Sequence, residues 1–174
     1  MIMKLCNPLP RMLMAMLVLW AAGSLNAVVA DQPAAKPAED VIKVVYHADF
    51  ADPRRFSAML SNIHNMVATY QSELKEYDVR IVFVSYGIRF VTQDKLAGTL
   101  FAEDAALKQR RAELLARLAT LRDNEGVKLE LCEITREAVH LPREKLIPGV
   151  TPVPSGVVRI AELQHQGYAY LKVE

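Results

Sequence analysis

One cysteine, Cys132, is the residue of this chain best suited to nucleophilic chemistry. It follows a short apolar run at residues 127–131 and precedes polar residues, so it stands where a strand is expected to end. A thiolate attacks sulfane sulfur and disulfides, which makes a reachable cysteine in this position a candidate sulfur carrier. The second cysteine, Cys6, lies in an N-terminal segment that we expect to be removed, and its loss leaves Cys132 without a disulfide partner in its own chain.

Three further residues that can support such chemistry, His47, Ser155 and Gly156, come just after other apolar runs. Backbone amides at the start of a helix beginning at Gly156 can hold an anionic sulfur species, and a protonated His47 can do the same. Each residue also has a simpler interpretation. His47 can be a solvated side chain, Ser155 a helix N-cap, and Cys132 a small apolar residue of the core.

Other catalytic and binding patterns are missing from the sequence. The histidines at positions 47, 64, 140 and 165 show no metal-ligand spacing, and there is no phosphate-binding loop or dinucleotide fingerprint, so we expect neither a metal nor a cofactor. Ser155 follows Val153 and Pro154 rather than the first glycine of a Gly-x-Ser-x-Gly motif, which argues against a hydrolase. Thiol chemistry and ligand binding are the functions that remain.

The elements that position these residues alternate along the chain. Apolar, β-branched runs predict strands, and three- and four-residue apolar spacing predicts the helices between them. Long crossovers without hairpin turns favour a mostly parallel five-stranded sheet with helices on both faces, a three-layer α/β domain over residues 41–174. The predicted strands are 41–46, 79–84, 127–131, 150–153 and 168–171, and the predicted helices are 53–75, 104–122 and 156–166.

The carboxyl ends of parallel strands form one edge of such a sheet, and ligands bind there. His47, Cys132, Ser155 and Gly156 are therefore expected along the same edge. Proline cannot donate a hydrogen bond to a strand ladder, so Pro152 predicts an edge position for its strand. Residues 88–96 are compatible with a short helix, and residues 135–140 with a helical turn.

The first 30 residues have the parts of a secretory signal peptide. Two basic residues precede an uninterrupted apolar run at 12–22, and small side chains follow at 28–30. We expect cleavage after Ala30, with Ala27 as the second choice, and hence a periplasmic or secreted protein. The apolar run is shorter than the roughly 20 residues that span a bilayer, so we expect no membrane association after the leader is removed. Residues 31–40, rich in Pro, Ala and charge, are expected to form a flexible N-terminus.

The charge of the chain after leader removal is close to neutral. Two of the 21 basic side chains leave with the leader, so residues 31–174 carry 19 basic and 20 acidic side chains. This balance provides no long-range field that attracts nucleic acid, and we expect no nucleic-acid partner. A chain of this length is the size of one ordinary domain.

The chain resembles the DsrE/DsrF-like family over nearly all of residues 41–174, and three segments carry the resemblance. They are VIKVVYHADFAD at 41–52, GVKLELCEIT at 126–135 and IPGVTPVPSGVVRIAELQHQGYAYLKVE at 147–174. The resemblance implies a flavodoxin-like or closely related parallel sheet, commonly assembled into homotrimers or hexamers. In the sulfur-relay members a cysteine after a strand carries sulfur as a persulfide, and Cys132 occupies the matching place.

Our leading hypothesis is a periplasmic, homo-oligomeric sulfur-relay protein. Cys132 accepts sulfane sulfur as a persulfide and passes it to a thiol of a partner protein, supported by His47, Ser155 and Gly156 and without a metal or organic cofactor. Whether this activity is that of a sulfurtransferase-like enzyme stays open. The alternative is a non-catalytic oligomeric binding or assembly module with a buried Cys132. A third possibility is a redox regulator that dimerises through Cys132.

Overall fold

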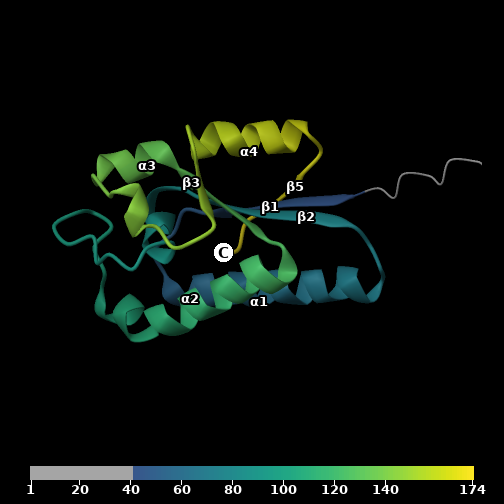
Figure 1. The fold of residues 1–174 in the computed structure, drawn as a ribbon, viewed down its shortest axis with the longest axis horizontal. Helices are drawn as coiled ribbons and strands as arrows, with labels where there is room; N and C mark the ends of the chain where they lie inside the picture. Colours follow the sequence, from purple (N-terminus) through teal and green to yellow (C-terminus); the bar gives the residue numbers. More distant parts are fainter. Residues whose placement is uncertain (1–40) are drawn as a thin grey trace, which may run out of the picture. The chain divides into compact units, whose positions relative to one another are not determined.

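The computed structural model describes residues 41–174, so the expected leader at 1–30 and the segment at 31–40 lie outside the described residues. The described chain builds a five-stranded sheet in the order β4-β3-β2-β1-β5, and every neighbouring pair of strands is parallel (Figure 1). The helical crossovers between strands produce this parallel pairing. The strands are β1 (Ile42–Ala48), β2 (Tyr77–Phe83), β3 (Lys128–Cys132), β4 (Val150–Val153) and β5 (Ala169–Leu171).

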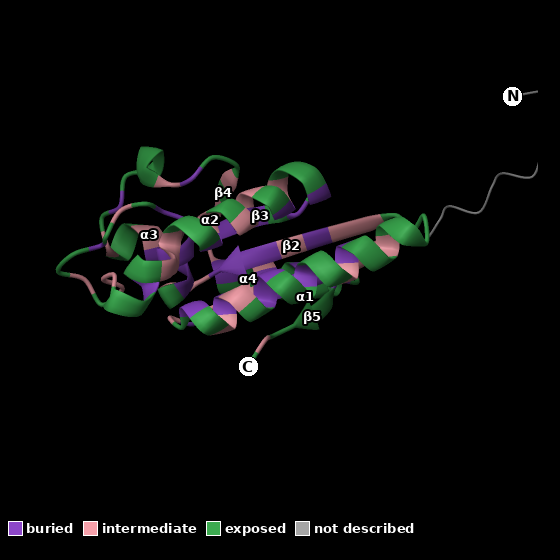
Figure 2. Ribbon diagram, turned by 90° about the horizontal axis from the view of Figure 1, so that it is seen from below, coloured by how far each residue is buried: buried purple, intermediate pink, exposed green. Residues whose placement is uncertain are grey.

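Helices cover both faces of the sheet, as predicted. α1 (Pro53–Ser72) and α2 (Ala105–Glu125) lie on one face, and α4 (Gly156–His165) lies on the other, with the short α3 (Glu133–Ala138) beside it (Figure 1). Figure 2 shows that β2 is buried for most of its length and that α1 buries one stripe while exposing another. The predicted three-layer α/β architecture is therefore confirmed.

Local sequence signals explain where the two long helices begin and end. The Asp52 carboxylate accepts a hydrogen bond from the Arg54 amide at 2.7 Å, and the Asp104 carboxylate accepts one from the Leu107 amide at 2.8 Å, so each acid caps a helix. Gly126 ends α2 in the left-handed conformation, with φ 67°. The buried apolar residues that recur at helical spacing are Phe56, Met59, Leu60, Ile63 and Val67 in α1, and Leu107, Leu114, Leu118 and Leu121 in α2.

The sheet separates two apolar cores of unequal size. The larger core lies between the sheet and the helices α1 and α2. The smaller one lies beneath α4 and consists of Val45, Val82, Ile160, Leu163 and Tyr168. One ten-residue helix leaves room on its face of the sheet for charged and polar side chains. Among the described residues, no helix is long and apolar enough to cross a membrane.

The segment after β2 differs from the prediction of a short helix at residues 88–96. The chain instead forms a 3-10 helix, η1 (Ser85–Phe90), and then irregular turns. Ile88, Phe90 and Val91 are buried there, so their spacing reflects burial of a loop and not a helical face. The turn expected at 135–140 is part of α3, which begins directly after Cys132. Pro152 lies in the edge strand β4, as predicted.

Candidate functional site

Cys132 is the last residue of β3 and directly precedes the first residue of α3. Its neighbour in the register of the sheet is Val153 of β4. The residue is 4% exposed, so its thiol lies beneath the surface at the carboxyl edge of the sheet. The sequence places the sulfur at the expected strand end, and the fold covers it.

Gly156, the first residue of α4, packs directly against Cys132. A Cβ atom at position 156 would lie 2.9 Å from the Cβ of Cys132 and 2.6 Å from Cγ2 of Val84. Both distances are shorter than ordinary van der Waals contact, so glycine allows the first turn of α4 to approach the ends of β2 and β3. Residues 132 and 156, predicted to share a site, are brought together.

Ser155 acts as the N-cap of α4. Its hydroxyl accepts a hydrogen bond from the Val158 amide at 3.4 Å, and its carbonyl accepts one from the Arg159 amide at 2.9 Å. The earlier amides of the first turn, which include that of Gly156, have no partner within the helix. Because helix N-termini favour negative charge, an anionic sulfur at Cys132 is close to favourable partial charges.

A buried ion cluster that the sequence reading missed fixes α4 on the sheet. Glu130, two residues before Cys132 and 5% exposed, accepts hydrogen bonds from Nε of Arg159 at 2.7 Å and from Nη1 of Arg80 at 2.7 Å. Burial favours the neutral carboxyl, but the bonds from Arg159 and Arg80 outweigh it and hold the pKa of Glu130 below its usual value. The feature of the sequence that could have indicated this cluster is Glu130, an acidic residue between the apolar Leu129 and Leu131 of the strand.

The cluster continues to Asp78 on β2. Nη2 of Arg80 donates to Oδ2 of Asp78 at 2.9 Å, and Nζ of Lys128 donates to the same oxygen at 2.6 Å. Burial opposes ionisation of this carboxyl, yet the two donors lower the pKa of Asp78 from 3.8 to about 2. Charged side chains thus take the space beside α4 that apolar residues leave free.

His47 lies on the same edge of the sheet but not beside Cys132. It pairs with Val82 in the register between β1 and β2, and β2 separates it from β3. Val82 in turn pairs with Glu130, two residues before Cys132, so with strands about 4.8 Å apart and about 3.3 Å per residue the backbones of His47 and Cys132 are separated by roughly 12 Å. His47 Nδ1 is hydrogen-bonded to the Tyr170 hydroxyl at 3.0 Å. Burial lowers the pKa of His47, partly opposed by the charge of Asp49, so the imidazole is neutral at pH 7.

Exposed apolar side chains flank the covered cysteine. Ile134, Val157 and Val158 are all exposed, although they adjoin the buried pair formed by Cys132 and Gly156 in the chain. The amide of Ser85 donates to the Thr135 hydroxyl at 3.0 Å and thereby connects η1 to α3. The first turns of α3 and α4, which begin beside Cys132 and Gly156, therefore expose apolar side chains.

Across residues 41–174, no group of three or more His, Cys, Asp or Glu side chains is arranged to hold a metal ion. The chemical groups at the site are the thiol of Cys132 and the N-terminus of α4, which the bonds between Arg159 and Glu130 hold on the sheet. This arrangement can hold an anionic sulfur on Cys132 once that atom becomes accessible.

Residues 41–174 thus form a parallel α/β domain with a cysteine at the carboxyl edge of its sheet. The model of the DsrE/DsrF-like family matches residues 41–173, and the chain belongs to that family. The resemblance noted in the sequence is thus confirmed. No curated protein matches this chain.

Two solved structures are similar to this chain. The protein of unknown function MTH1491 from Methanobacterium thermoautotrophicum has 24% sequence identity and a TM-score of 0.57, and the match covers 75% of this chain and 98% of that one. The ychN protein from E. coli has 19% identity and a TM-score of 0.45, with 76% of this chain and 99% of that chain covered. The likeness to MTH1491 supports the fold.

Proposed function

We propose that this DsrE/DsrF-like protein carries sulfane sulfur on Cys132, as a persulfide, outside the cytoplasm. The Cys132 thiolate attacks a sulfane sulfur atom of the donor, forming a new S–S bond while the donor's S–S bond breaks and its remainder leaves with the electron pair. An acceptor thiolate then attacks the outer sulfur and releases Cys132 as thiolate. The family association with sulfur relay supports the class of chemistry.

The observation that carries this proposal is the contact of Cys132 with the N-terminus of α4. The missing side chain of Gly156 lets the first turn of α4 approach the sulfur-bearing residue, with 2.9 Å between Cβ of Cys132 and the position of a Cβ at 156. The persulfide and the thiolate are both anions, and helix N-termini stabilise anions. The bonds between Arg159 and Glu130 hold this helix against β3.

A second candidate function is favoured by the burial of Cys132. A thiol that is 4% exposed must be uncovered before a donor can attack it or be attacked by it. If the site stays closed, the chain is a non-catalytic binding or assembly module in which Cys132 serves as a core residue.

Mass spectrometry after exposure to polysulfide tests the carrier function. A Cys6→Ser background leaves Cys132 as the sole thiol. We expect an increase of about 32 Da, which corresponds to one added sulfur atom, on the tryptic peptide 129–136. The increase disappears after dithiothreitol treatment, and in Cys132→Ala no peptide carries it. An unmodified peptide 129–136 after prolonged exposure refutes the carrier function.

Thiol labelling separates the two candidates without any assumption about the donor. The carrier requires Cys132 to react with a small maleimide in the folded protein within minutes to hours. Reaction only in denaturant supports the binding module, because a permanently buried thiol has no access to the reagent.

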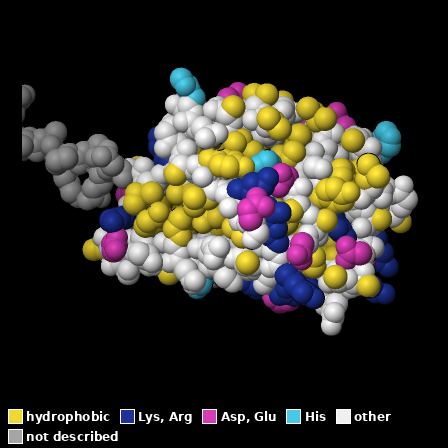
Figure 3. Space-filling model, turned by 180° about the vertical axis from the view of Figure 1, so that it is seen from behind, with side chains coloured by type: hydrophobic (Ala, Val, Ile, Leu, Met, Phe, Trp, Pro, Cys, Tyr) yellow, Lys and Arg dark blue, Asp and Glu magenta, His cyan; other side chains and the backbone are white. Residues whose placement is uncertain are grey.

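We further propose that the protein acts as a homotrimer or homohexamer with a thiol-bearing partner protein. The edge strand β5 is exposed in all three residues, including Tyr170 and Leu171. Figure 3 shows patches of apolar side chains separated by acidic and basic groups on the face opposite to that of Figure 1. An uncovered edge with apolar side chains is suited to contact with another copy.

Light scattering at several protein concentrations tests the assembly, and cell fractionation tests the periplasmic location.

A further inference from the structure

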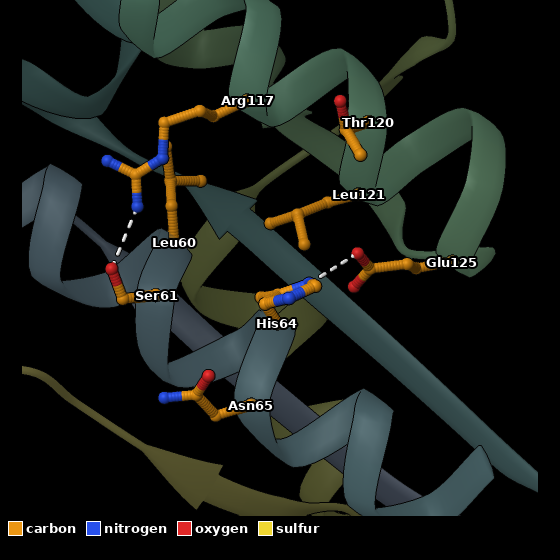
Figure 4. A pocket seen from close by; sticks show the side chains of 8 residues that line it. All are labelled: Leu60, Ser61, His64, Asn65, Arg117, Thr120, Leu121 and Glu125. Carbon is orange, nitrogen blue, oxygen red and sulfur yellow. Dashed lines mark hydrogen bonds and ion pairs between the residues drawn. The ribbon is translucent and has the colours of Figure 1, made fainter. Parts of the chain in front are cut away.

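A cavity between α1 and α2 lies on the face of the sheet opposite to Cys132. Its volume is about 400 Å³, which is in the range of small-molecule sites. The buried side chains of Leu60 and Leu121 contribute apolar surface, and Ser61, Asn65 and Thr120 contribute polar groups (Figure 4). The cavity therefore combines apolar surface with polar groups from two helices.

A buried carboxylate lines this cavity with one oxygen unpaired. Glu125, the last residue of α2, has a side chain that is 9% exposed. Its Oε1 lies 2.7 Å from Nδ1 of His64, on α1, whereas its Oε2 is buried and, within the described residues, has no hydrogen-bond partner. Figure 4 shows the two side chains meeting across the space between the helices. A buried charged oxygen without a donor is costly, so the site is incomplete as it stands.

The nearby arginine does not supply the missing donor. Arg117 donates to Ser57 and Ser61 and to the carboxylate of Glu113. Among residues 41–174, the side chain that contacts the Glu125 carboxylate is His64, which carries a charge only when it is protonated. The positive charge of Arg117 is thus used elsewhere in the cavity wall, and Oε2 of Glu125 has no donor among the described residues.

We propose that this cavity binds a small aliphatic ammonium ion. A small rotation of the Glu125 carboxylate uncovers Oε2, the ammonium group donates a hydrogen bond to that oxygen, and the ammonium charge compensates the carboxylate. The alkyl chain packs on Leu60 and Leu121, the apolar residues that line the cavity. A neutral donor can form the hydrogen bond but does not compensate the negative charge, and a quaternary ammonium compensates the charge but has no N–H group to donate.

Titration calorimetry with three probes tests this site. n-Butylammonium has both features, n-butanol has the donor without the charge, and tetramethylammonium has the charge without N–H donors. We expect saturable binding of n-butylammonium and binding of the other two that is weaker by about tenfold or more. Absence of saturable n-butylammonium binding up to about 10 mM, or equal binding of tetramethylammonium, overturns the proposal.

Variants locate the binding. Glu125→Gln is expected to weaken n-butylammonium binding by about tenfold or more, because the neutral amide no longer compensates the charge. Asp123→Asn removes the same charge from an exposed position on α2 and is the matched control, with unchanged binding. Equal losses in the two variants indicate a general charge effect and refute the site.

A third variant keeps the test valid if Glu125→Gln does not fold. Thr120 is exposed at the rim of the cavity, so Thr120→Phe is expected to leave the fold intact and to block the cavity. Unchanged binding in Thr120→Phe places the amine elsewhere and overturns the proposal. Cys132→Ala is expected to bind n-butylammonium as the wild type does, so this site is tested independently of sulfur transfer.

Discussion

Replacing Gly156 with alanine tests the contact on which the candidate site depends. The added Cβ falls 2.6 Å from Cγ2 of Val84 and 2.9 Å from Cβ of Cys132, so α4 has to move. Overpacking of this kind costs about 1–3 kcal/mol. The better helix propensity of alanine returns at most about 0.5–1 kcal/mol. We therefore expect Gly156→Ala to lower the free energy of unfolding by about 1–2 kcal/mol.

Urea unfolding followed by circular dichroism measures this change. Gln164→Ala, at an exposed position on the same helix, is the control and should change the stability by less than about 0.5 kcal/mol. Adding Val84→Ala removes the methyl group nearest to the new Cβ, so the double variant should lose less stability than the sum of the two single variants. Additive losses would show that the clash with Val84 is not the cause.

The same variant has a functional readout. Displacement of the first turn of α4 uncovers Cys132, so Gly156→Ala should react faster with a maleimide than the wild type while still folded. A variant with wild-type stability and a wild-type labelling rate would refute the packing of α4 on the strand ends, and with it the anion-stabilising role of that helix.

Three further expectations concern ionisable side chains of the sheet and of α4. The pKa of Asp78 is about 2, below its ordinary value of 3.8, so the stability that its ionised form contributes is complete above about pH 4 and is lost as the pH falls toward 2. In Asp78→Asn, the free energy of unfolding measured in urea should therefore fall less over this pH range. The pKa of His47 is lowered from 6.5, so the unfolded state takes up its proton first and stability falls as the pH drops below 6.5; a pH series on His47→Gln should lack that decrease. Arg159→Ala removes two hydrogen bonds from the buried carboxylate of Glu130 and should lower the free energy of unfolding by about 1–3 kcal/mol. The variant should also label faster with a maleimide at Cys132. Unchanged labelling would mean that this ion pair does not hold α4 over the thiol.

The strands and long helices could be predicted because each leaves a local pattern in the sequence. Runs of β-branched residues, the acidic caps Asp52 and Asp104, and the stop at Gly126 all act within a few residues. The order of strands and helices then fixes the parallel sheet. The position of Cys132 at a strand end follows from the same local information.

Contacts between distant segments could not be predicted in this way. The close approach of Gly156 to Cys132 depends on how α4 lies across the sheet, and the register that separates His47 from Cys132 depends on β2 lying between them. Covering of the thiol is a result of the same packing. The hydrogen bond between His64 and Glu125 connects residues 61 positions apart, and no local sequence pattern predicts this contact.

The tight seating of α4 on Cys132 gives sulfur loading a mechanical consequence. A persulfide carries one more sulfur atom than a thiol, and that atom needs space comparable to that of the methyl group that close packing already excludes at position 156. Occupied and empty forms of the carrier must then differ in the placement of the first turn of α4, where Val157 and Val158 face solvent. An acceptor protein that binds those valines would distinguish the persulfide form of the carrier from the thiol form before the sulfur is transferred.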